Sequence, residues 1–105
     1  MTFIGMISDH KSFDKVKEEL KETQLELIHI NKKSIGNIKN IKFEIIIINS
    51  NLENFTNEIN IIEKLCSKSK YVIINTDINL QFEILNQDKT NIITYGLNQK
   101  ADNSI

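Results

Sequence analysis

The sequence is poor in residues that crosslink or interrupt a chain, with one cysteine, three glycines and no proline or tryptophan. The single cysteine, Cys66, cannot form a disulfide within the chain, so we expect stability to come from a packed core. The missing proline and tryptophan, with heavy use of Ile, Asn and Lys, are typical of codon bias in an AT-rich genome. An individual asparagine is therefore weak evidence for a functional site.

The few glycines also exclude two nucleotide-binding motifs. Residues 7–12, which follow the first expected strand, read Ile-Ser-Asp-His-Lys-Ser. They lack the glycines and the Lys-Ser/Thr pair that cradle phosphates, so neither a P-loop nor a dinucleotide-binding fingerprint is present. We therefore expect no ATP hydrolysis and no bound cofactor.

Neither a strong net charge nor a long apolar run is present. The 13 basic and 14 acidic residues give a formal net charge of -1, so no whole-protein field attracts nucleic acid or anionic lipid. No apolar run approaches the ~18 residues of a membrane span, and no signal peptide begins the chain. We expect a cytoplasmic protein that binds neither nucleic acid nor membrane.

Five apolar segments rich in β-branched residues predict strands. The continuous run 45–48 is typical of a strand covered on both faces, whereas 25–30 alternates in part and suits the edge of a sheet. The expected strands lie at residues 3–7, 25–30, 43–48, 71–74 and 92–95.

Between these strands the apolar spacing changes to that of helices. We expect Ser12 to cap the first helix, which buries Phe13. Further helical segments are expected at residues 55–66, around Gly36 and at residues 80–85.

The alternation of strands and helices predicts one α/β domain over residues 1–105, a small three-layer αβα sandwich of the Rossmann or flavodoxin-like kind. Its five-stranded sheet should be parallel. We favour the strand order 2-1-3-4-5 over the alternative 3-2-1-4-5.

In such sheets, ligands bind outside the carboxyl ends of the strands, near the point where the strand order reverses. The alternative role for each polar residue there is a helix cap, because Ser, Asn and Asp cap the helices that follow strands. The candidate ligand-binding residues are Asp9, Asn49, Asn75, Thr76, Asp77 and Gly96.

Three chemically reactive side chains have simpler interpretations. His10 stands beside Asp9, but two adjacent residues supply neither a metal shell nor a nucleophile, so we expect no metal site. Cys66 falls on the apolar side of a helix and is expected to be a packed thiol. His29 lies within a strand and is expected to be structural.

Two segments near the C-terminal end, residues 71–77 and 91–102, carry a family resemblance. In one, a strand ends in Asn-x-Asp; in the other, a strand ends in an aromatic residue and a glycine, with an Ala-Asp pair beyond it. This pattern resembles the central domain of the Mur ligases, which join amino acids to peptidoglycan precursors. The matching positions are Asn75, Asp77, Tyr95, Gly96, Ala101 and Asp102.

The chain also departs from the Mur ligase pattern. Ile78 stands where that family has a second acid, and the family's P-loop has no counterpart. The resemblance therefore implies shared architecture without ligation, in a module that binds a nucleotide-linked precursor or a partner protein.

A second resemblance is to the receiver domains of response regulators, which share this size and alternation. Receivers carry acids after the first strand, a phosphoacceptor Asp after the third and a Thr or Ser after the fourth. Asp9, Asn49 and Thr76 stand at these places. Because an amide cannot take a phosphoryl group as a carboxylate does, this resemblance implies a degenerate receiver.

The leading hypothesis is a non-catalytic binding or interaction module, whose partner is a nucleotide-linked small molecule or another protein. The first alternative is a receiver-like signalling domain, which would act through its surfaces and form a homodimer. A further alternative is a small enzyme that uses Asp9 or Asp77 with His10.

Overall fold

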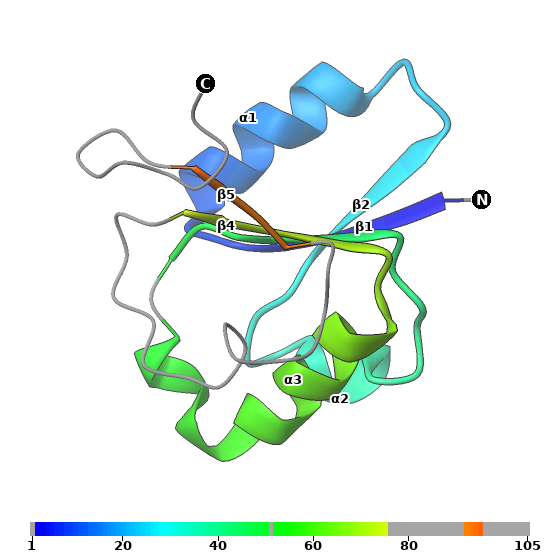
Figure 1. Ribbon diagram of the computed structural model, residues 1–105. Coiled ribbons are helices and arrows are strands. Elements are labelled where there is room, and N and C mark those ends of the chain that lie inside the picture. The colour runs from blue at the N-terminus through cyan, green and yellow to red at the C-terminus, as the bar shows by residue number, and fades with distance from the viewer. Residues whose placement is uncertain (1, 51, 76–91, 96–105) are drawn as a thin grey trace.

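A computed structural model of the chain describes residues 2–50, 52–75 and 92–95. Five strands form one parallel sheet in the order β2-β1-β3-β4-β5 (Figure 1). The parallel sheet and the order 2-1-3-4-5 are confirmed, and the alternative order is wrong. The strands are β1 (Thr2–Ile7), β2 (Leu25–His29), β3 (Ile45–Ile48), β4 (Tyr71–Asn75) and β5 (Ile92–Tyr95).

Helices cover both faces of this sheet. Helix α1 (His10–Leu20) lies on one face, and α2 (Ile35–Ile38) and α3 (Ile59–Lys68) lie on the other (Figure 1). A 3₁₀ helix, Glu53–Glu58, leads into α3. The predicted three-layer arrangement is therefore present.

The interior position of β3 follows from its apolar run. Its Ile46 and Ile48 are almost fully buried, while Ile45 and Ile47 pack against the core on the α1 side. A strand that is apolar on both faces belongs inside the sheet, and β3 pairs with β1 and β4. The partly alternating β2 occupies an edge, as predicted.

Two helices differ in detail from the prediction, and a third predicted helix is not among the described residues. Asp9, and not Ser12, is the N-cap of α1, because the Asp9 carboxylate accepts a hydrogen bond from the Ser12 backbone N–H. The expected helix at 55–66 is a 3₁₀ helix followed by α3, since Phe55 has non-helical backbone angles. The helix expected at residues 80–85 lies outside the described residues.

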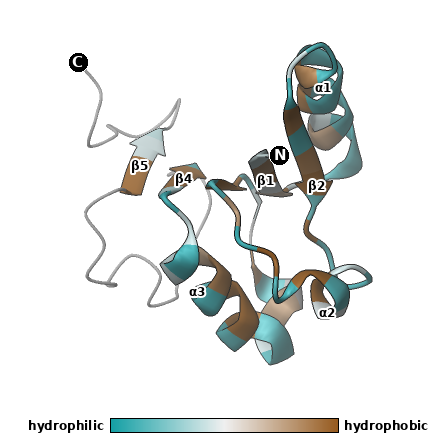
Figure 2. Ribbon diagram, turned by 90° about the vertical axis from the view of Figure 1, so that its right-hand side faces the viewer, coloured by the Kyte–Doolittle hydropathy of each residue, from teal (hydrophilic) through white to brown (hydrophobic). Residues whose placement is uncertain are grey.

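The core is divided between the two faces of the sheet. The larger cluster lies on the side of α2 and α3 and includes Phe43, Ile62 and Cys66, so the predicted packed thiol is confirmed. The smaller cluster lies under α1 and includes Met6 and Phe13. In Figure 2 the strands are mostly hydrophobic brown, and α1 is mainly hydrophilic teal.

Gly5 allows two side chains to pack closely on β1. A Cβ atom at this position would lie 2.6 Å from Ile30 Cδ1 and 3.1 Å from two ring carbons of Phe43. The glycine is therefore required by close packing in the larger cluster, just before the strand end that leads into the candidate site. None of the helices in the described part of the chain is long and apolar enough to cross a membrane.

Candidate functional site

The loops that follow β1, β2 and β3 enclose an open pocket at the carboxyl edge of the sheet. Its volume is about 790 Å³. Because β1 lies between β2 and β3, the strand order reverses here, which is where open α/β sheets bind ligands. The residues that line it are Ile7, Ser8, Asp9, His10, His29, Ile30, Asn31, Lys32, Lys33, Ser50, Glu53 and Phe55.

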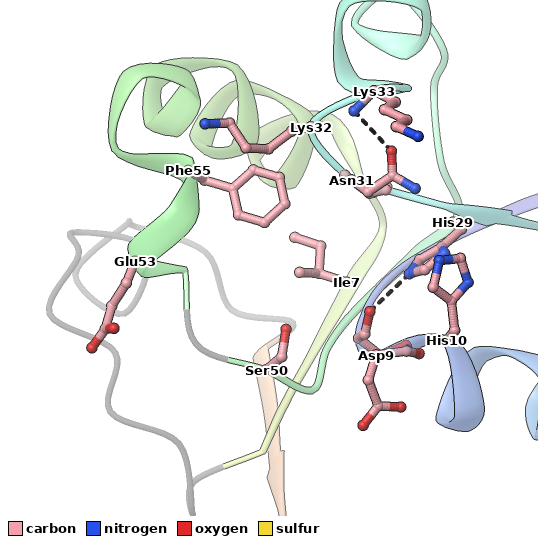
Figure 3. A pocket seen from close by; sticks show the side chains of 12 residues that line it. Ile7, Asp9, His10, His29, Asn31, Lys32, Lys33, Ser50, Glu53 and Phe55 are labelled. Carbon is pink, nitrogen blue, oxygen red and sulfur yellow. Dashed lines mark hydrogen bonds between the residues drawn. The ribbon is translucent and has the colours of Figure 1, made fainter.

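The floor of the pocket is apolar and belongs to the main core. Ile7 and Ile30 are each 1% exposed, and the Phe55 ring is buried beside them. Figure 3 shows Ile7 between Phe55 and Ser50. An apolar floor surrounded by a few polar side chains is typical of small-molecule pockets.

Asp9, a predicted site residue, lies at the pocket but also has a structural role. Its Oδ1 accepts a hydrogen bond of 2.6 Å from the Ser12 backbone N–H, and its carbonyl accepts one of 3.1 Å from the Phe13 N–H. The hydrogen bond from Ser12 holds the pKa of Asp9 below its ordinary value. The carboxylate therefore stays ionised near neutral pH while it caps α1.

Two histidines form a wall of the pocket next to Asp9. The His29 ring stacks on Phe13 with a centroid separation of 4.4 Å, and His10 meets His29 edge to face at 5.1 Å. His29 Nε2 donates a hydrogen bond of 2.8 Å to the Ser8 carbonyl, which favours the Nε2–H tautomer. His29 thus makes packing and hydrogen-bond contacts within the fold, and it also lines the pocket.

The turn after β2 supplies three further pocket residues, which are Asn31 at the strand end and the adjacent Lys32 and Lys33. Asn31 Oδ1 accepts hydrogen bonds from the backbone N–H groups of Lys33 and Ser34, both at 2.9 Å. The Asn31 N–H in return donates to Ser34 Oγ at 3.0 Å. The spacing of Asn and Ser three residues apart signals this turn.

Two other predicted residues meet in a separate cluster, at the ends of β3, β4 and β5. Asn49 Oδ1 accepts a hydrogen bond of 2.8 Å from Asn75 Nδ2 and one of 2.7 Å from the Tyr95 hydroxyl. Neither Asn49 nor Asn75 lines the pocket beside β1. The side chains in this cluster hydrogen-bond one another across three strands.

The six predicted site residues are therefore divided. Asp9 lies at the pocket, and Asn49 and Asn75 lie in the cluster with Tyr95. Thr76, Asp77 and Gly96 lie outside the described residues. In the described ranges, no three His, Cys, Asp or Glu side chains gather as metal ligands do.

Comparison of the chain with known protein families, with curated proteins and with solved structures finds no match. The likenesses to Mur ligases and to receivers therefore stay predictions made from short motifs. The pocket and the cluster have to be interpreted from their own chemistry.

Proposed function

We propose that this protein is a non-catalytic binding module that holds a small molecule in the pocket beside β1. The observation that carries the proposal is the pocket itself, about 790 Å³ in volume and formed by the loops after β1, β2 and β3. Ligand pockets commonly measure about 300–1,000 Å³. Its position at the reversal of strand order is the one that this fold uses for ligands.

The ligand class we favour is a nucleotide-linked small molecule. The buried side chains of Ile7 and Phe55 suit the flat, weakly polar face of a base, and Lys32 and Lys33 supply positive charge at the rim. The resemblance of the Asn75 region to the Mur ligases implies the same ligand class. Binding without ligation remains the expectation, since the P-loop residues of that family are missing from the sequence.

The chemistry of Asp9 favours binding over catalysis. A general acid or base works best when its pKa lies near the operating pH, whereas the hydrogen bond from Ser12 lowers the pKa of Asp9. Its Oδ1 is also committed to the cap of α1. These two facts make the small-enzyme alternative weaker than the binding module.

A thermal-shift panel of nucleotides and nucleotide-sugars tests the proposal. A ligand present at about a hundred times its dissociation constant should stabilise the fold by ~2.7 kcal/mol. For a domain of this size that is a rise of roughly ten degrees in Tm.

Ser50→Phe, which fills the pocket from its rim, should abolish the shift. Gln24→Phe is the matched control, because exposed Gln24 lines a different pocket near the start of β2. A panel without any shift would overturn the proposal and favour a protein partner. So would a shift that survives Ser50→Phe.

The second candidate is a degenerate receiver that signals through its surfaces, including as a homodimer. The observation in its favour is that Asn49 directly follows β3 and lies at the centre of the Asn49–Asn75–Tyr95 cluster, in a sheet of order 2-1-3-4-5. Receiver-type folds use this order. Asn49→Asp should then gain a phosphoryl group from acetyl phosphate, as seen by intact mass, while the wild-type chain should not. An unmodified Asn49→Asp protein would count against this candidate.

A further inference from the structure

In many α/β proteins the phosphate of a ligand binds at the N-terminus of the helix that follows β1. In this protein a carboxylate already occupies that position. Asp9 Oδ1 lies 2.6 Å from the Ser12 backbone nitrogen, and the pKa of Asp9 is lowered by that hydrogen bond. A ligand anion at this end of the pocket would meet a fixed negative charge.

The opposite side of the pocket has the complementary charge. Lys32 and Lys33 lie on the turn after β2, across the pocket from Asp9 and Ser50 (Figure 3). Lys32 Nζ is 3.9 Å from Glu58 Oε1, so its charge is partly offset. Lys33 takes part in none of the three ion pairs found within residues 2–50, 52–75 and 92–95. Of the two lysines at the rim, Lys33 is therefore the one whose charge none of these ion pairs offsets.

The turn also orients a neutral donor next to Lys33. Because Asn31 Oδ1 accepts two backbone hydrogen bonds, the orientation of the Asn31 amide is set and its Nδ2 group is the part left to donate. Ser34 anchors the turn to β2, since Ser34 Oγ donates a hydrogen bond of 2.8 Å to the His29 carbonyl. The backbone of Lys33 is held by the same turn, which reduces the entropy lost on binding.

We infer that the pocket binds the phosphate group of its ligand between Lys33 Nζ and Asn31 Nδ2, on the turn after β2. The N-terminus of α1 does not take the phosphate, because Asp9 already caps it. The apolar part of the ligand then lies over Ile7 and Phe55, and its uncharged polar groups face Asp9. This inference rests on the proposed binding function and specifies which end of the pocket recognises charge.

The test compares AMP with adenosine, and UMP with uridine, in titrations of ¹⁵N-labelled protein followed by NMR. The nucleotide of at least one pair should bind about tenfold more tightly than its nucleoside, as expected for a charge-assisted hydrogen bond. The largest amide shifts caused by the phosphate should fall on residues 31–35. Lys33→Gln should remove the preference for the nucleotide.

The matched control is Lys42→Gln, because Lys42 is an exposed lysine that does not line the pocket. It should retain the preference for the nucleotide in full. Three results would overturn the inference alone: equal binding of nucleotide and nucleoside, a preference that survives Lys33→Gln, or shifts centred on residues 10–13. If neither member of any pair binds, the proposed function is rejected for these ligands, and the inference with it.

Discussion

The two halves of the carboxyl edge both carry polar strand-end residues, but they use them differently. At the ends of β3, β4 and β5, the side chains of Asn49, Asn75 and Tyr95 hydrogen-bond one another. Around β1 and β2, the side chains of Asp9 and Asn31 bond mainly to backbone N–H groups and line an open pocket.

The structure thus assigns different roles to asparagines that look alike in the sequence, since each of them follows a strand. An asparagine after a strand is compatible with a cap, with a contact to another strand end, or with a ligand contact. Asn49 makes a contact across strands, and Asn31 holds a turn that places Lys33 at the pocket. The partner of each polar atom, rather than its position after a strand, indicates which residues are available to a ligand.

The largest loss of stability that we predict comes from the floor of the pocket beside β1 and β2. Ile7→Ala should lower the free energy of unfolding by about 2–5 kcal/mol, since it removes a nearly fully buried side chain from the main core. Urea denaturation measures this change. Ile47→Ala is the comparison, and its loss should be smaller because Ile47 is half-buried. A loss well under 1 kcal/mol for Ile7→Ala would show that the pocket floor is separate from the core.

A smaller loss of stability is expected in the Asn49–Asn75–Tyr95 cluster at the ends of β3, β4 and β5. Asn49→Ala removes the oxygen that accepts from Asn75 and Tyr95, and should lower the unfolding free energy by about 1–3 kcal/mol. Asn49→Asp keeps an acceptor oxygen, so its stability at pH 7 should be closer to that of the wild type. At the pocket, by contrast, Ser50→Ala should change the unfolding free energy by less than about 0.5 kcal/mol. Equal losses of stability for Asn49→Ala and Ser50→Ala would show that the cluster and the pocket do not differ in this way.

The smallest effect is the pH dependence of the cap on α1. The pKa of Asp9 is lower in the folded chain than its ordinary value, so its contribution to stability is present above about pH 4 and is lost as the pH falls through the folded pKa. Melting curves from pH 7 to pH 2 should show this loss in the wild type. Asp9→Asn keeps a good capping side chain and should show less of the loss. Identical pH profiles would mean that the carboxylate charge contributes nothing to the cap.

Much of the fold was predictable because its signals are local. The apolar run at Ile45–Ile48 predicted an interior strand, and the partial alternation near Leu25 predicted an edge strand. The boundaries were less predictable. Ser12 was expected to cap α1, but the cap is Asp9, whose carboxylate accepts a hydrogen bond from the Ser12 N–H. Asp and Ser are similarly good caps, so the direction in which the chain enters α1 decides between them.

The candidate site was predictable only as a region. Asp9 and Asn31 both follow strands at this edge of the sheet and both line the pocket, whereas Lys33 carried no signal of a site in the sequence. Asn31 carries the same residue type as Asn49, and codon bias made each asparagine weak evidence. Which of them holds a turn and which joins another strand depends on neighbours far away in the sequence, such as Tyr95 for Asn49.

The sequence by itself determined the parallel α/β sheet, because β-branched runs and helical spacing are properties of neighbouring residues. It favoured the strand order 2-1-3-4-5 over 3-2-1-4-5, and the pairing of the strands decided between the two. It also determined that the polar residues after the strands gather at one edge of the sheet, because parallel strands deliver their following loops to one side. Only the tertiary structure decided that Asn49 meets Asn75 and Tyr95, while Asp9 and Lys33 lie on opposite sides of an open pocket. These contacts depend on the register and spacing of strands that are far apart in the sequence, and a local pattern of residues does not show which distant side chains come together.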